Sequence, residues 1–166
     1  MLQIAIDAAD QADVQKRMLV LGAHHKEIQN SIDLKSVDLT VNPAWEEGMS
    51  ATLKVALNQV LEKDPDTDQI LVMLCDQPFV DSELLDSMIA AQAAEGKGIV
   101  ACYYQETFGV PVLFDRKYFE EIMALSGQDG AKQLIYKHPD DTTAIDFPEG
   151  KIDIDTKEDY ENLKGK

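Results

Sequence analysis

Short apolar runs alternate with longer amphipathic segments along the first hundred residues of the chain. The run from Met18 to Leu21, which a glycine follows, fits a buried parallel strand. The segment 50–61, with leucine, alanine and valine side chains on one face, fits a surface helix. We expect strands at 18–21, 37–41, 70–74 and 98–104, and helices at 2–16, 25–32, 50–61 and 81–94. This alternation predicts a parallel sheet with helices on both faces.

The last third of the chain has a less regular pattern. No repeat, low-complexity tract or linker interrupts it, so we expect one domain spanning residues 1–166. Here the pattern predicts a strand at 110–114, helices at 115–125 and 130–136, weak strands at 145–147 and 151–154, and a helix at 157–163 capped by Thr156.

The strong net negative charge of the chain argues against some classes of binding partner. The chain has 31 acidic and 15 basic residues, a net charge of −16, so nucleic acids and anionic membranes are poor partners. No apolar run approaches the roughly 20 residues of a membrane span, and the N-terminus carries acids where a signal peptide has bases. Cys75 and Cys102 lie in apolar runs, which predicts two buried free thiols in a cytoplasmic protein.

The stretch LVMLCDQP places the carboxylate of Asp76 directly after a predicted strand. Ligands of open parallel sheets bind beyond the carboxyl ends of the strands, which favours a site role for this acid. Alternatively, Asp76 caps the next turn, whose geometry Pro78 fixes.

A second candidate site follows strand 37–41, in the stretch NPAWEEGMS. Gly48 lets the backbone approach a ligand closely, and the helix that begins near Ser50 offers free N–H groups to an anion or a base carbonyl. The alternative is that Ser50 caps its own helix.

Three further segments carry candidate chemistry. Asp153 and Asp155 follow the last weak strand and could meet Asp76 at the sheet edge, where carboxylates and phosphate oxygens suit Mg²⁺; alternatively, Asp155 or Thr156 caps the final helix. Gly109 could let a bulky ligand approach, and Pro111 suits an edge strand or a bulge. The segment 127–132, with two glycines and Lys132, could accept a phosphate, although a loop before a helix explains it equally well.

The chain contains neither a G-x-x-x-x-G-K-[ST] loop nor a G-x-G-x-x-G motif. A Ser/His/Asp arrangement is not readable either. The chemistry left open is metal-assisted transfer that depends on positioning and charge neutralisation.

Together, four of these segments resemble the nucleotidyltransferases of molybdenum-cofactor maturation, the MobA/MocA-like group of the nucleotide-diphospho-sugar transferase fold. The resemblance rests on VNPAWEEGMSATLKVAL at 41–57, LVMLCDQPFV at 71–80, GVPVLFDRKYFEEIMALSG at 109–127 and DIDTKEDYENL at 153–163. Their order and spacing match, and the likeness runs from about residue 1 to residue 163.

The resemblance implies a Rossmann-like three-layer α/β/α sandwich with a mostly parallel sheet. It also implies Mg²⁺-dependent transfer of CMP or GMP from CTP or GTP to molybdopterin, with release of pyrophosphate, and a molybdoenzyme or its chaperone as a further partner. For catalysis and metal binding it implies Asp76, with Asp155 as a second metal ligand and Asp153 as the weaker candidate. For the nucleotide it implies Asn42, Gly48, Met49, Ser50 and Asp76. For the acceptor it implies Gly109, Pro111 and Lys132.

The chain also departs from the family pattern. Family members open with a strand and a glycine-rich LAAGxSxRMGxxK loop that cradles the triphosphate, whereas MLQIAIDAAD resembles the helix after that loop. We expect either that upstream residues carry the loop, which we favour, or that the chain is a shortened relative. The neighbours of the absent central strand would then lack a hydrogen-bond partner. The relatives' GDxGAR also appears as GQDGAK, which weakens a phosphate role for Lys132.

Two other functions fit parts of the pattern. A non-catalytic module that binds a nucleotide or pterin and hands it on would not need the missing loop. A response-regulator-like domain would use Asp76 as a phosphoacceptor, but it also needs an acidic pair near the first strand and a strand-end lysine, and neither is evident.

Overall fold

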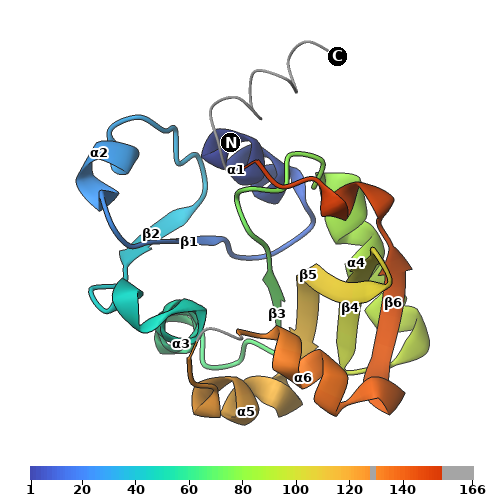
Figure 1. Ribbon diagram of the computed structural model, residues 1–166. Helices are drawn as coiled ribbons and strands as arrows, with labels where there is room; N and C mark the ends of the chain where they lie inside the picture. Colours follow the sequence, from blue (N-terminus) through green and yellow to red (C-terminus); the bar gives the residue numbers. More distant parts are fainter. Residues whose placement is uncertain (128–129, 155–166) are drawn as a thin grey trace.

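The computed structural model describes residues 1–127 and 130–154 and has an α/β fold (Figure 1). Helical turns of the 3-10 type, η1 to η4, cover Trp45–Glu47, Arg116–Tyr118, Pro139–Asp141 and Pro148–Lys151. The α-helices are α1 (Leu2–Gln11), α2 (His25–Gln29), α3 (Met49–Lys63), α4 (Ser82–Glu95), α5 (Phe119–Ala124) and α6 (Lys132–Lys137). The strands are β1 (Met18–Leu21), β2 (Asp38–Val41), β3 (Gln69–Val72), β4 (Ile99–Tyr104), β5 (Thr107–Asp115) and β6 (Thr142–Asp146).

These strands form two sheets. β1 and β2 pair in parallel, and the other four strands form a sheet in the order β3-β5-β4-β6. β3, β4 and β6 run in one direction, and β5 runs against them because it pairs antiparallel with both β3 and β4. Within residues 1–127 and 130–154, no strand pairs with the outer edge of β1 or of β3. That these two edges flank an absent central strand stays a prediction.

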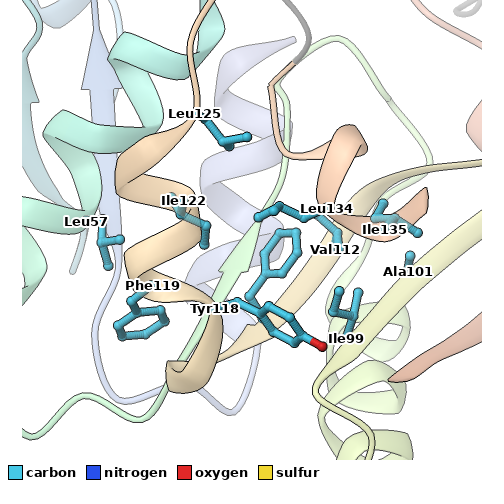
Figure 2. Packing of buried hydrophobic residues seen from close by; sticks show 11 residues of the cluster. Leu57, Ile99, Ala101, Val112, Tyr118, Phe119, Ile122, Leu125, Leu134 and Ile135 are labelled. Atoms are coloured by element: carbon cyan, nitrogen blue, oxygen red, sulfur yellow. The ribbon is translucent and has the colours of Figure 1, made fainter. Parts of the chain in front are cut away.

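Helices cover both faces of the four-stranded sheet, so the fold is the expected Rossmann-like three-layer sandwich. Alternation along β4 divides its side chains between two hydrophobic clusters. Ile99 and Ala101 pack with residues of α3, α5 and α6 on one face, where the aromatic ring of Phe119 and the side chain of Ile122 close the layer (Figure 2). On the other face, Val100 and Cys102 pack with residues of α4 and with the end of the α1 segment.

The sequence pattern located each α-helix and strand, but not every 3-10 turn, and the helix expected at 2–16 ends at Gln11. Other ends follow local chemistry. The side chain of Asp81 accepts a hydrogen bond from the backbone N–H of Leu84 and caps α4, as predicted. Gly96 ends the same helix in the left-handed conformation, which glycine adopts without strain. Within the described part of the chain, no helix is long and apolar enough to cross a membrane.

Some expectations for the later part of the chain need correction or lie outside the described residues. The weak strand at 151–154 is wrong, because this segment contains the end of η4 and irregular backbone. Cys75 is exposed rather than buried, because β3 ends at Val72 and the apolar run continues into a loop. Both cysteines are free, as expected. The helix at 157–163 and its Thr156 cap lie outside the described residues.

Candidate functional site

The loop that follows β3 carries Asp76 at the carboxyl edge of the four-stranded sheet. One carboxylate oxygen of Asp76, Oδ1, is buried, and no group among the described residues hydrogen-bonds to it. A turn cap would need such a bond, so this oxygen does not cap the following turn. A buried carboxylate oxygen without a donor is costly, and the arrangement calls for a cation or an external donor.

The segment after β6 meets this loop. The backbone N–H of Ile154 donates to the backbone oxygen of Asp76 at 2.9 Å, and in Figure 1 the red segment after β6 runs beside the green loop after β3. Burial raises the pKa of the Tyr104 hydroxyl, and the carboxylates of Asp153 and Asp76 raise it further. Two acidic segments that are far apart in the sequence therefore converge near Tyr104. Asp155 lies outside the described residues, and its pairing with Asp76 stays a prediction.

The donor set near Asp76 suits a hard divalent cation. Its Oδ1 atom is buried and unpaired, and the exposed Asp153 lies on the neighbouring segment. The described residues contain no cluster of three or more histidine, cysteine or acidic side chains that could enclose a metal ion. Mg²⁺ does not require such a cage, because it commonly binds one or two carboxylates together with water and substrate phosphates.

A second part of the edge lies at the start of α3. Gly48 precedes the helix with φ 101° and ψ −177°, a conformation that other residues rarely adopt. Neither a capping side chain nor an acidic residue occupies the first turn of α3, so its N–H groups are available to an acceptor. Ser50 does not cap the helix: its hydroxyl is buried and donates to the carbonyl oxygen of Gly127. Met49 is half exposed beside this turn.

Beside the helix start lies a cavity of about 320 Å³, near the lower limit of typical ligand pockets. Asn42 lines it, but both ends of its side chain are engaged: Nδ2 donates to Thr52, and Oδ1 accepts from the N–H of Ala44. Asn42 therefore shapes the cavity by fixing the turn after β2. The residues that line the cavity are Asn42, Ala44, Glu47, Ser50, Ala51, Lys54, Val55, Ser126 and Gly127. None of them belongs to the loop of Asp76.

The three residues predicted to bind the acceptor do not form one surface. Pro111 is fully buried in β5, which lies between β3 and β4, so its assignment to an edge strand is wrong. It lies at the register shift between Ala101 and Cys102, so the bulge is confirmed. At Gly109, an added Cβ atom would lie 2.1 Å from the Tyr104 hydroxyl oxygen, so a protein side chain makes the expected close approach. Lys132 is exposed at the start of α6.

Sequence reasoning gave no role to Gln77 and Tyr104, which lie beside Asp76. Gln77 is 4% exposed, and its Nε2 atom donates to the Tyr104 hydroxyl at 3.1 Å. Gln77 follows Asp76 directly in DQP, but its partner Tyr104 is 27 positions away. A polar residue next to a site acid was the available signal, and only the fold reveals its partner.

The sequence matches the MobA-like NTP transferase domain over residues 1–142. Rv0371c of Mycobacterium tuberculosis H37Rv is 31% identical and superposes with a TM-score of 0.80, covering 99% of this chain and 83% of that protein. The structure of Rv0371c with manganese, also from M. tuberculosis, gives 29% identity, a TM-score of 0.78 and coverage of 99% and 86%.

A more distant structure supports the fold alone. The 4-diphosphocytidyl-2C-methyl-D-erythritol synthase of Anaerococcus prevotii is 16% identical, with a TM-score of 0.75, and the match covers 99% of this chain and 84% of that one. A search of curated protein sequences gave no significant match.

Proposed function

Because the chain belongs to the family of MobA-like NTP transferase domains, we propose that it transfers CMP or GMP from CTP or GTP to the terminal phosphate of molybdopterin. Its family makes it a nucleotidyltransferase, and the donor base and the pterin acceptor are the proposed part. The observation that carries the proposal is the buried, unpaired Oδ1 of Asp76 next to the acidic segment 152–154.

In the proposed reaction, an oxygen of the acceptor phosphate attacks the α-phosphorus of the nucleoside triphosphate. A new P–O bond joins acceptor and nucleotide, and the bond to the β-phosphate oxygen breaks so that pyrophosphate leaves. The reaction needs no protein nucleophile, because catalysis depends on alignment and on neutralisation of the developing charge.

Asp76 would hold a divalent cation, with Asp155 as the proposed second carboxylate and Asp153 as the weaker candidate. A bound Mg²⁺ ion would neutralise phosphate oxygens of donor and acceptor. The burial of Oδ1 strengthens its interaction with a cation, because this atom is shielded from water. The manganese complex of the M. tuberculosis protein, a relative at 29% identity, supports the binding of a divalent metal by this chain.

The start of α3 would receive the nucleoside. Gly48 brings the backbone close to a ligand without a Cβ atom in the way, and Met49 offers an apolar surface. The N–H groups of Met49 and Ser50 can donate to a base carbonyl or a phosphate oxygen, with the positive end of the helix dipole behind them. Lys54, which lines the neighbouring cavity, adds a cation in a strongly anionic protein.

On the acceptor side, Lys132 is the proposed contact, since its exposed ammonium group can pair with the acceptor phosphate. Gly109 and Pro111 would act indirectly, through the bulge of β5 and the position of Tyr104.

The test is pyrophosphate release by the full-length protein with CTP or GTP, molybdopterin and Mg²⁺. We expect Asp76→Asn to lower kcat/KM by at least about 100-fold, because the amide carries no charge to hold the cation. The matched control is Asp66→Asn, which changes an exposed acid in the loop before β3 and should leave the rate unchanged.

Chelation with EDTA should stop the reaction, and either Mg²⁺ or Mn²⁺ should restore it. Equal rates for the two aspartate variants would contradict the role of Asp76. If calorimetry shows binding of CTP or molybdopterin but no pyrophosphate is released, the non-catalytic module that binds a ligand and hands it on is favoured over the enzyme.

A further inference from the structure

Gln77 is a buried amide that connects the Asp76 loop to two other parts of the chain. Its Nε2 atom donates to the Tyr104 hydroxyl at 3.1 Å and to the backbone oxygen of Gly150 at 2.9 Å. Tyr104 ends β4, and Gly150 belongs to η4 in the segment after β6. One side chain thus joins the loop after β3 to the end of β4 and to η4.

The orientation of this amide follows from its partners. The oxygen of Gly150 can only accept a hydrogen bond, so the NH₂ group of Gln77 must face it. The Tyr104 hydroxyl accepts the second N–H of the amide and donates its own proton to the backbone oxygen of Val110 at 3.2 Å. Each donor has an acceptor, which favours a single, rigid arrangement.

Two glycines make room for this arrangement. A Cβ atom added at Gly109 would lie 2.1 Å from the hydroxyl oxygen of Tyr104, and one at Gly150 would lie 2.6 Å from a carbon of its ring. No side chain fits at either position without displacing the tyrosine. Tyr104, which accepts the hydrogen bond from Gln77, is therefore held between β5 and η4.

The carbonyl end of Gln77 is also informative. Its Oε1 atom is buried and has no hydrogen-bond partner among the described residues, as is the case for Oδ1 of Asp76. A buried amide oxygen without a donor is costly. A hydrophobic side chain of similar size would avoid this cost, but it would leave the backbone oxygen of Gly150 without this donor.

We propose that Gln77 is a positioning residue that sets the spacing between Asp76 and the segment 152–154, which carries Asp153, and thereby tunes divalent-cation affinity. This inference rests on the proposed metal role of Asp76. Gln77 holds Gly150, and four residues later the N–H of Ile154 bonds to the backbone of Asp76. Without the amide, the Gln77–Gly150 bond is lost and the backbone bond between Ile154 and Asp76 remains. We expect the two segments to separate more easily.

The test uses Mn²⁺ alone as the probe, with free Mn²⁺ measured by electron paramagnetic resonance in the presence of the full-length protein. We expect Gln77→Met, which keeps the volume but cannot donate, to weaken binding by about 10- to 100-fold, as loss of an outer-shell partner does at other metal sites. Tyr104→Phe should weaken it less, because the bond to Gly150 remains. The matched control is Gln69→Met at the other end of β3, which loses an amide bond to Gln92 and should bind Mn²⁺ normally.

A second readout does not depend on metal. Hydrogen exchange at the amide of Ile154 should accelerate in Gln77→Met and not in Gln69→Met, since only the first variant releases the segment after β6. If Gln77→Met does not fold, Tyr104→Phe should show both effects in weaker form, because it removes one of the two acceptors that orient the amide.

The outcomes separate this inference from the proposed function. If Asp76→Asn abolishes Mn²⁺ binding but Gln77→Met and Tyr104→Phe leave binding and Ile154 exchange unchanged, the inference is overturned and the proposed function stands. If the wild-type protein shows no Mn²⁺ binding that depends on Asp76, the metal role of Asp76 fails, and the inference fails with it.

Discussion

β1 and β4 have similarly apolar sequences but very different surroundings. The run Ile99 to Cys102 in β4 is completely buried, whereas in β1, with the sequence MLVL, only Leu21 is buried. β4 has a strand on each side and helices on both faces. β1 pairs with β2 alone within residues 1–127 and 130–154. The burial of a strand thus depends on its neighbours, and an apolar run by itself does not reveal them.

The two parts of the candidate site therefore lie on sheets that differ in how densely they are packed. The loop of Asp76 and Gln77 rests on the densely packed four-stranded sheet. The cavity near Asn42 and the start of α3 lie beyond the end of β2, in the two-stranded sheet, while the later turns of α3 pack on the four-stranded sheet. Local stability follows the density of buried apolar contacts, so we expect the metal side of the site to be more rigid than the nucleoside side.

The largest effect should come from comparing the same truncation in the two sheets. Leu113→Ala removes a side chain that is 1% exposed in β5, and it should cost about 3–4 kcal/mol in the free energy of unfolding. Leu39→Ala in the half-buried β2 should cost only about 1–2 kcal/mol, because less apolar surface is lost. Urea denaturation measures both, and equal losses would remove the distinction between the sheets.

An intermediate loss of stability is expected at Gly48, which precedes α3 with a positive φ. Gly48→Ala forces an alanine into the φ 101° conformation and should cost about 1–3 kcal/mol. It should also weaken nucleotide binding, which calorimetry with CTP measures. Gly96→Ala is the control: its φ is 66°, no atom lies within 4 Å of the added methyl group, and the expected cost is nearer 1 kcal/mol. A greater loss of stability for Gly96→Ala would contradict this prediction.

The smallest effect concerns ion pairs in the two parts. Asp141, beside the four-stranded sheet, lies 2.7 Å from Lys117 and accepts from the Tyr118 hydroxyl. Burial raises its pKa, but the hydrogen bonds from Lys117 and Tyr118 outweigh burial and lower the pKa from 3.8 to about 2. Asp141→Asn should therefore cost on the order of 1 kcal/mol at neutral pH.

The pH dependence gives this prediction its sign. A carboxylate whose folded pKa is depressed stabilises the protein above its ordinary pKa and loses that contribution as the pH falls. The stability difference between wild type and Asp141→Asn should be full above about pH 4 and disappear toward pH 2. The control is Asp7 in α1, a partly exposed carboxylate that pairs with Lys35 in the loop before β2, and Asp7→Asn should give no resolvable change. A constant Asp141→Asn difference between pH 5 and pH 2 would contradict this account.

Much of the fold could be predicted from the sequence, because local patterns record it. The helical faces, the Asp81 cap and the short strands followed from periodicity and capping chemistry, and they place Asp76 at a strand end. The antiparallel direction of β5 could not be predicted, because the run 110–114 is as apolar as a parallel strand. The exposure of Cys75 was missed for a related reason: the apolar run LVMLC continues past the last hydrogen bond of β3.

For the site, the sequence by itself determined the chemistry: an acid after a strand, a glycine before a helix, and an acidic segment near the end of the chain. Tertiary structure alone decided what surrounds them. It engaged Asn42 and Ser50 in bonds to the protein, placed Tyr104 against Gly109, and joined Gln77 to Gly150. Those contacts connect residues up to 77 positions apart, and side-chain partners at such separations depend on packing geometry that no local pattern encodes.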